Sequence, residues 1–144
     1  MTVVRSAVES TERREAERLA GCERRLGECE AKLEELRRYH AEYELALRQR
    51  GREGMNAAAA RDYKVFLARL IAAIDQQTRL LARVRAERDA MHAQWRTAAR
   101  RSHSVGELVT RWRDDERRTL ERRDQRESDD RGQRNRSQGE LPER

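Results

Sequence analysis

Residues 39–77, which read YHAEYELALRQRGREGMNAAAARDYKVFLARLIAAIDQQ, contain the one strong break inside a long helical pattern. The break is the segment 51–56, GREGMN. Gly51 suits the left-handed residue that ends a helix, and Asn56 suits the N-cap of a helix that opens with four alanines. The stretch therefore predicts the turn of a helical hairpin, with aromatic side chains beside the turn.

The composition is typical of long solvated helices. Of 144 residues, 42% are charged and 36% are hydrophobic, which is too little apolar content for a compact core. The single proline is Pro142, so no earlier residue is forbidden to be helical. We expect a first helix over 1–50, a turn over 51–56, a longer helix over 57–131 and a disordered charged tail over 132–144.

Both arms of the expected hairpin carry a heptad seam. Apolar residues recur at alternating spacings of three and four, the pattern of a left-handed coiled coil. In the first arm the seam is Leu19, Cys22, Leu26, Cys29, Leu33, Leu36, His40, Tyr43 and Leu47. In the second it is Tyr63, Leu67, Leu70, Ile74, Gln77, Leu81, Val84, Arg88, Met91, Trp95, Ala98, Ser102, Val105, Val109 and Trp112. The predicted fold is all-α, an elongated antiparallel two-helix coiled-coil hairpin.

The register of the two arms has two candidates. Pairing residues whose numbers add to 103 puts Glu15 opposite Arg88. Sliding by one heptad, to a sum of 110, puts Glu15 against Trp95 and Cys22 against Arg88. Because a buried unpaired charge is costly, we prefer the first register.

No pattern in the chain predicts catalysis. The three histidines are far apart, there is no metal-ligand spacing, and there is no glycine-rich phosphate loop. We therefore expect no catalytic residue, no cofactor and no metal, and we do not expect an enzyme. Cys22 and Cys29 lie about 10 Å apart along one helix, too far to bond each other. They are either small core residues or partners in an interchain disulfide.

The sequence also restricts the location and the class of partner. No stretch approaches the roughly 20 apolar residues of a membrane span, and the N-terminus lacks the apolar segment of a secretion signal. A cytoplasmic protein without a transmembrane segment is expected. The net charge of +6 arises in residues 51–105, which hold 11 basic and 5 acidic residues. This excess indicates a solvated arginine face or an acidic protein partner, and nucleic acid is not the expected ligand.

Apolar residues also occur outside the a/d seam beside the turn. They are Tyr39, Phe66, Ala73 and Leu80, which occupy g positions. A two-stranded coil covers g positions only partly, so these residues would form an exposed apolar stripe. The stripe is either a partner site or a widening of the hairpin core.

The order of motifs around the turn resembles the FliJ family, the soluble coiled-coil component of the flagellar type III export apparatus. The matching pieces are LRRYHAEYELAL, GREGMNAAAARDY, YKVFLARLIAAIDQQ, AQWRTAARRSHSVGELVTR and RRDQRESDDRGQR. The resemblance implies a hairpin similar to the central stalk of rotary ATPases. Its implied role is a non-enzymatic one in flagellum biogenesis, motility and chemotaxis, at the cytoplasmic face of the inner membrane. The implied partners are a hexameric export ATPase, a membrane export gate protein and export chaperones.

The resemblance also implies partner-binding residues by position. The gate-contacting surface falls on Leu36, Tyr39, Tyr43, Phe66, Leu70, Ala73 and Gln77, to which the apolar stripe adds Leu80. Gln77 stands where some members have histidine. Mixed charge near both termini suggests contacts with the ATPase ring from Arg5, Arg13, Arg14, Arg100, Arg101, Arg111 and Arg113. The alternatives are the stalk of a virulence injectisome, a generic coiled-coil scaffold, or a basic nucleic-acid-binding coil.

Overall fold

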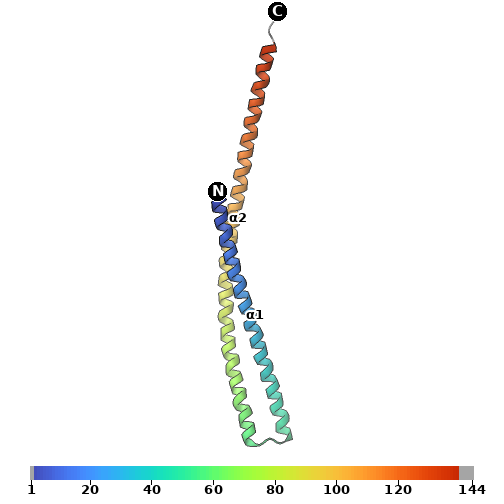
Figure 1. The fold of residues 1–144 in the computed structure, drawn as a ribbon. Coiled ribbons are helices and arrows are strands. Elements are labelled where there is room, and N and C mark those ends of the chain that lie inside the picture. Colours follow the sequence, from blue (N-terminus) through green and yellow to red (C-terminus); the bar gives the residue numbers. More distant parts are fainter. Residues whose placement is uncertain (1, 140–144) are drawn as a thin grey trace, which may run out of the picture. The chain divides into compact units, whose positions relative to one another are not determined.

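The structure, a computed structural model, describes residues 2–139 and contains two α-helices in this range (Figure 1). Helix α1 runs over Thr2–Glu53 and α2 over Ala57–Gly139, and the two pack against each other. The predicted all-α helical hairpin is therefore confirmed. The chain divides into two compact units, which we call the hairpin unit, Thr11–Ala98, and the terminal unit, residues 2–10 with 99–139.

The turn begins later than the sequence suggested. Helix α1 continues through Gly51 to Glu53, and Gly54, with φ of 91°, is the left-handed residue. Either glycine can adopt positive φ without steric cost. The assignment of the left-handed residue to Gly51 was wrong, and that residue lies about one turn of helix later. Asn56 is the expected cap, because its Oδ1 accepts the backbone N–H of Ala59 at 2.8 Å. Its carbonyl also accepts the N–H of Ala60 at 3.1 Å, so α2 begins where predicted.

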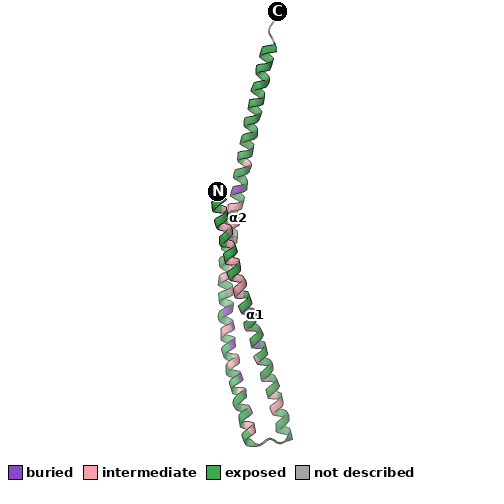
Figure 2. Cartoon of the chain, viewed as in Figure 1, coloured by how far each residue is buried: buried purple, intermediate pink, exposed green. Residues whose placement is uncertain are grey.

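The core of the molecule follows the predicted seams. Buried residues recur along the facing sides of both helices in the hairpin unit (Figure 2). The buried positions among the described residues are Leu26, Leu33, Leu70, Gln77, Leu81, Val84, Ala98 and Val109. Leu26, Leu33, Leu81 and Val84 form one cluster, with Cys29, Ile74 and Leu80 packed against it. All of these residues except Leu80, a g-position residue, occupy a or d positions, so heptad spacing located the core and Leu80 widens it.

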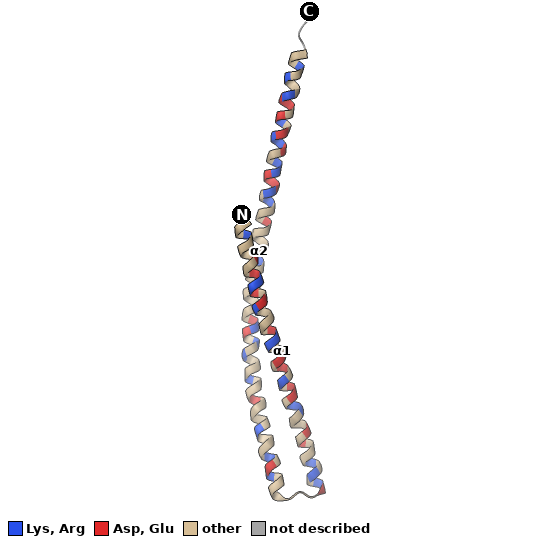
Figure 3. Ribbon diagram, viewed as in Figure 1, with Lys and Arg blue, Asp and Glu red and all other residues tan. Residues whose placement is uncertain are grey.

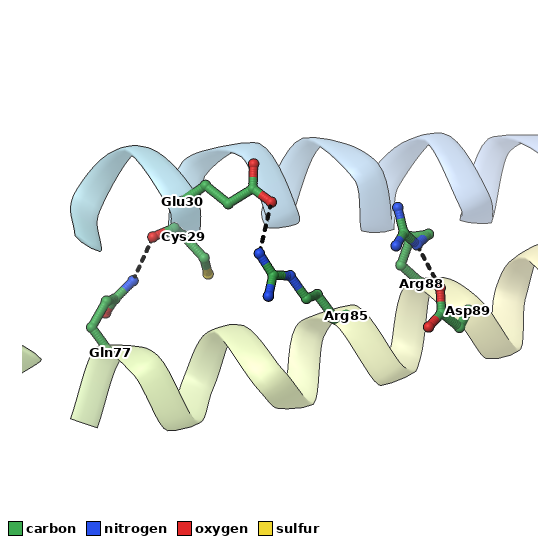
Figure 4. Close-up of polar contacts among 6 residues, drawn as sticks. All are labelled: Cys29, Glu30, Gln77, Arg85, Arg88 and Asp89. Carbon is green, nitrogen blue, oxygen red and sulfur yellow. Dashed lines mark hydrogen bonds and ion pairs between the residues drawn. The ribbon is translucent and has the colours of Figure 1, made fainter. Parts of the chain in front are cut away.

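The register differs from the one we preferred. Gln77 Nε2 donates to the carbonyl of Cys29 at 3.1 Å, and Arg85 pairs with Glu30 at 3.6 Å (Figure 4). Arg25 pairs with Glu87 at 3.1 Å. The numbers of these cross-helix partners add to 106, 115 and 112. Their mean is 111, which lies next to 110, the register displaced by one heptad, and the preference for 103 was wrong.

Polar seam residues find partners on their own helix, which removes the reason for the rejected register. Arg88 pairs with its neighbour Asp89 at 2.8 Å and keeps its side chain partly exposed (Figure 4). Glu15 pairs with Arg18 through one oxygen at 3.5 Å. Arg88 needs no partner across the seam, whereas the second oxygen of Glu15, Oε2, is buried without a hydrogen-bond partner. Apolar packing between Leu26 and Val84 therefore outweighs this cost and governs the alignment.

The register can be tested with a native thiol. In a Cys29→Ser background, Arg88→Cys should form an intrachain disulfide with Cys22 under mild oxidation, because 22 and 88 add to 110. Leu81→Cys, which adds to 103 with Cys22, should not, since one heptad moves the thiols about 10 Å apart. The measurement is the mobility of the monomer band on a non-reducing gel. The reverse pattern would restore the sum of 103.

Helix α2 extends farther than the expected domain bounds. The sequence suggested a disordered tail from residue 132, but helix continues to Gly139, and residues 140–144 lie outside the described range. Acidic and basic residues are interspersed in α2 up to Arg131, whereas the charged residues of 132–139 are Arg134 and Arg136 (Figure 3). Glu127 pairs with Arg123 at 3.4 Å and with Arg131 at 3.9 Å, and Gln125 donates to Asp129 at 3.3 Å. Such pairs between successive turns support a helix without tertiary packing.

Candidate partner-binding surfaces

Three rings from both helices meet beside the turn, and we call them the aromatic cluster: Tyr43, Tyr63 and Phe66. The Tyr43 ring lies 4.6 Å from Phe66 and 6.4 Å from Tyr63 between centroids, both tilted. The guanidinium of Arg50 lies 5.4 Å over Tyr63. Tyr43 and Phe66 each remain 39% exposed. The cluster is thus both a closing contact of the hairpin and an exposed apolar surface.

Tyr39, the third ring of the expected gate surface, is separate from the cluster. Its side chain is 44% exposed and its hydroxyl donates to Glu35 on the same helix at 3.2 Å. Sequence reasoning about the gate surface missed Tyr63 and Arg50. The signal for both was present, because Tyr63 is a seam residue and Arg50 lies in the last turn of α1.

A groove of about 670 Å³ lies between the helices of the hairpin unit, and we call it the basic groove. It is lined by Lys32, Leu36, Ala73, Gln76, Gln77, Arg79, Leu80 and Arg83. Leu36, Ala73, Gln77 and Leu80 were expected at the gate surface, whereas the three basic residues were not. Arg79 pairs with Asp75 at 2.8 Å, but no ion pair of Lys32 or Arg83 is found among residues 2–139. The groove therefore offers an apolar floor with uncompensated positive charge.

Two of the expected gate residues are buried instead of exposed. Leu70 is 9% exposed and Gln77 is 7% exposed. The amide of Gln77 points at the backbone of α1 and donates to Cys29 (Figure 4). Its hydrogen bond holds the two helices in register, so any effect of Gln77 on a partner acts through the position of its neighbours.

The arginines expected at the ATPase ring fall into both units. Arg5, Arg100, Arg101, Arg111 and Arg113 belong to the terminal unit, whereas Arg13 and Arg14 belong to the hairpin unit. Arg5 and Arg111 line one groove together with Glu9, Ser102, His103, Gly106, Glu107 and Thr110. Within it Arg5 pairs with Glu9 at 2.9 Å, and His103 lies 3.4 Å from Glu107. This groove has mixed charge, as the sequence suggested.

A second feature of the terminal unit is an exposed apolar face on α2. Trp112 is 58% exposed, and Leu108 and Leu120 are 53% and 54% exposed. The sequence placed Trp112 on the seam, but the last buried seam residue among residues 2–139 is Val109, which is 3% exposed. The buried part of the seam therefore ends before Trp112. A groove on this face is lined by Trp112, Asp115, Glu116, Thr119 and Leu120. We call these five residues the acidic stripe.

The arginine excess of the second arm is partly neutralised within the hairpin unit. Glu30 and Glu87 each pair with an arginine of the opposite helix, and both pairs remain about half exposed. Exposed pairs contribute only about 0.2–1 kcal/mol each, so they adjust the charge of the surface more than the stability. This arrangement agrees with a solvated, partly compensated face.

Within residues 2–139, neither helix has a stretch long and apolar enough to cross a membrane.

Comparison with known proteins identifies the family. A family model described as flagellar FliJ protein matches residues 1–140 of the 144. No curated protein and no solved structure matches the chain. The family model covers nearly the whole chain, and the helical hairpin agrees with the expected fold. The chain belongs to the FliJ family and is a component of the flagellar export apparatus.

Proposed function

We propose that this chain is a central-stalk-like coiled coil that couples the hexameric export ATPase to the membrane export gate and assists export chaperones. It would act without catalysis of its own, at the cytoplasmic face of the inner membrane at the flagellar base. Family membership supports a place in the export apparatus. The observation that carries the coupling role is the exposed pair of rings, Tyr43 and Phe66, beside the turn.

Exposed rings on a polar helix pair are suited to anchor a partner. With about two fifths of each ring exposed, a partner would bury on the order of 80 Å² per ring, or about 2 kcal/mol before the costs of association. The neighbouring side chains of Leu36, Ala73 and Leu80 extend the apolar area along the basic groove. A few such anchors commonly provide most of the energy of an interface.

The proposed gate surface consists of the exposed and partly exposed members of the expected set. They are Leu36, Tyr39, Tyr43, Phe66, Ala73 and Leu80. Leu70 and Gln77 support this surface from beneath, because both are buried between the helices. We assign contact with the ATPase ring to the terminal unit, whose mixed-charge groove around Arg5 and Arg111 suits a lumen lined by polar loops.

Separate variants can distinguish the two roles. Tyr39→Ala with Phe66→Ala should weaken gate binding at least tenfold, because two partly exposed rings contribute more than 1.4 kcal/mol together. Stimulation of ATPase activity should remain. Truncation after Ser104 should have the reverse effect, since it removes Arg111 and Trp112. The measurements are affinity for the purified gate domain and the rate of ATP hydrolysis.

The matched control changes apolar residues of the same helix outside the proposed surface. Val65→Ala with Ile71→Ala removes two exposed side chains, 48% and 56% exposed, and should leave gate binding unchanged. Helicity is checked by circular dichroism for every variant, because a folding defect would also reduce binding. If the folded Tyr39/Phe66 variant binds the gate like the parent, neither ring anchors the gate, and Phe66 only helps to close the hairpin.

A further inference from the structure

Two surfaces of this chain are complementary to each other in charge. The basic groove is lined by apolar, amide and basic side chains and contains no acidic one. The acidic stripe is lined by apolar, hydroxyl and acidic side chains and contains no basic one. We propose that the acidic stripe of one copy docks in the basic groove of a second copy, so that the free protein self-associates.

The stripe has the form of an amphipathic helix that enters a groove. Trp112, Glu116 and Leu120 are each four residues apart, so they lie along one side of α2. From Trp112 to Leu120 the helix rises about 12 Å, and from Ala73 to Arg83 the groove follows α2 for about 15 Å. The incoming helix would pack as a third helix against the pair, with Trp112 over the floor formed by Leu36, Ala73 and Leu80.

The charges at both surfaces are largely available for this contact. Glu116 has no ion pair among residues 2–139, and the same holds for Lys32 and Arg83. Asp115 lies 4.0 Å from Arg118, and both of these side chains are highly exposed. The acidic stripe thus presents free carboxylate to a groove that presents free cations. Exposed pairs are screened by salt, so the association should weaken as ionic strength rises.

The contact joins two different patches. Two copies can therefore exchange both contacts about a two-fold axis, or make a heterologous contact that extends from copy to copy. The patches are small, so the association should be weak and reversible. If the proposed function holds, the second copy covers Leu36, Ala73 and Leu80, and self-association competes with the gate.

The test is self-association of the full chain, measured by sedimentation velocity from low to high micromolar concentration. The parent should show a concentration-dependent rise in mass, which diminishes in high salt. Trp112→Ala, Arg83→Glu and Glu116→Arg should each weaken association at least tenfold. Mixing the Arg83→Glu and Glu116→Arg chains should restore it, because each chain then meets a patch of opposite charge.

The restored mixture excludes a folding defect as the cause of the losses. Matched controls are Arg69→Glu and Asp124→Arg, exposed charges of α2 outside both patches, which should associate like the parent. A parent that remains monomeric throughout overturns the proposal, and the groove is then open to a different protein. Association that survives both charge reversals, or a mixture that stays monomeric, also overturns it. These measurements do not involve the gate, so their outcome is independent of the proposed function.

Discussion

Val84→Asp is expected to unfold the hairpin unit at room temperature. Val84 is 1% exposed, the most deeply buried side chain of the described core, and it packs with Leu26, Leu33 and Leu81. The change loses about 1.5–3 kcal/mol of apolar burial and places a carboxylate among leucine side chains without a partner. The combined loss of about 4 kcal/mol or more is a large part of the usual 5–15 kcal/mol of a domain.

The measurement is urea or thermal unfolding followed by circular dichroism. Ala82→Asp is the matched control, because it introduces the same residue into the same turn of α2 at an exposed position. It should reduce the free energy of unfolding by less than about 1 kcal/mol, the cost of helix propensity and surface charge. A Val84→Asp chain that still unfolds cooperatively near the parent midpoint would contradict the core described for the hairpin unit.

Residues 113–139 are expected to melt separately from the hairpin unit. Nearly all of these side chains are exposed, and none belongs to the apolar cluster. Ion pairs between successive turns, such as Arg117 with Glu121 at 3.8 Å, contribute only a few tenths of a kcal/mol each. A helix held by such pairs loses structure gradually on heating, whereas packed helices unfold cooperatively.

Heating should therefore produce a gradual loss of about one fifth of the helical signal before the cooperative transition, the share of residues 113–139 among the helical residues. Truncation after Trp112 should remove the gradual phase and leave the cooperative midpoint unchanged. Glu127→Gln removes the partner of both Arg123 and Arg131 and should move the gradual phase to lower temperature. A single cooperative transition in the full chain would show that this part of α2 is packed against something.

Local chemistry made the hairpin predictable. The cap at Asn56 depends on its own oxygen and the N–H of Ala59, three residues away. The choice of Gly54 over Gly51 as the left-handed residue was not predictable in the same way. Either glycine tolerates positive φ, and which of them adopts it depends on where the packing of the two helices places the turn.

Part of the partner surface could also be anticipated. Tyr39, Tyr43 and Phe66 are exposed beside the turn, as a g-position stripe and a family resemblance suggested. The arginine face of the second arm was anticipated, but its meeting with Lys32 was not, because Lys32 and Arg83 come from different helices and meet only through packing. The spacing placed Gln77 on the seam, but its hydrogen bond to the carbonyl of Cys29 was not predictable, since the two residues lie 48 positions apart.

The sequence by itself determined the two helices, the cap and the seam, because each depends on residues within a few turns of one another. Only the tertiary structure decided the register, since a heptad pattern is unchanged by a slip of seven residues. Polar seam residues did not resolve the choice, because Arg88 and Glu15 pair within their own helices. The contact that identifies the register is the hydrogen bond from Gln77 to the carbonyl of Cys29, which joins residues 48 positions apart. Its geometry exists only after the helices have packed.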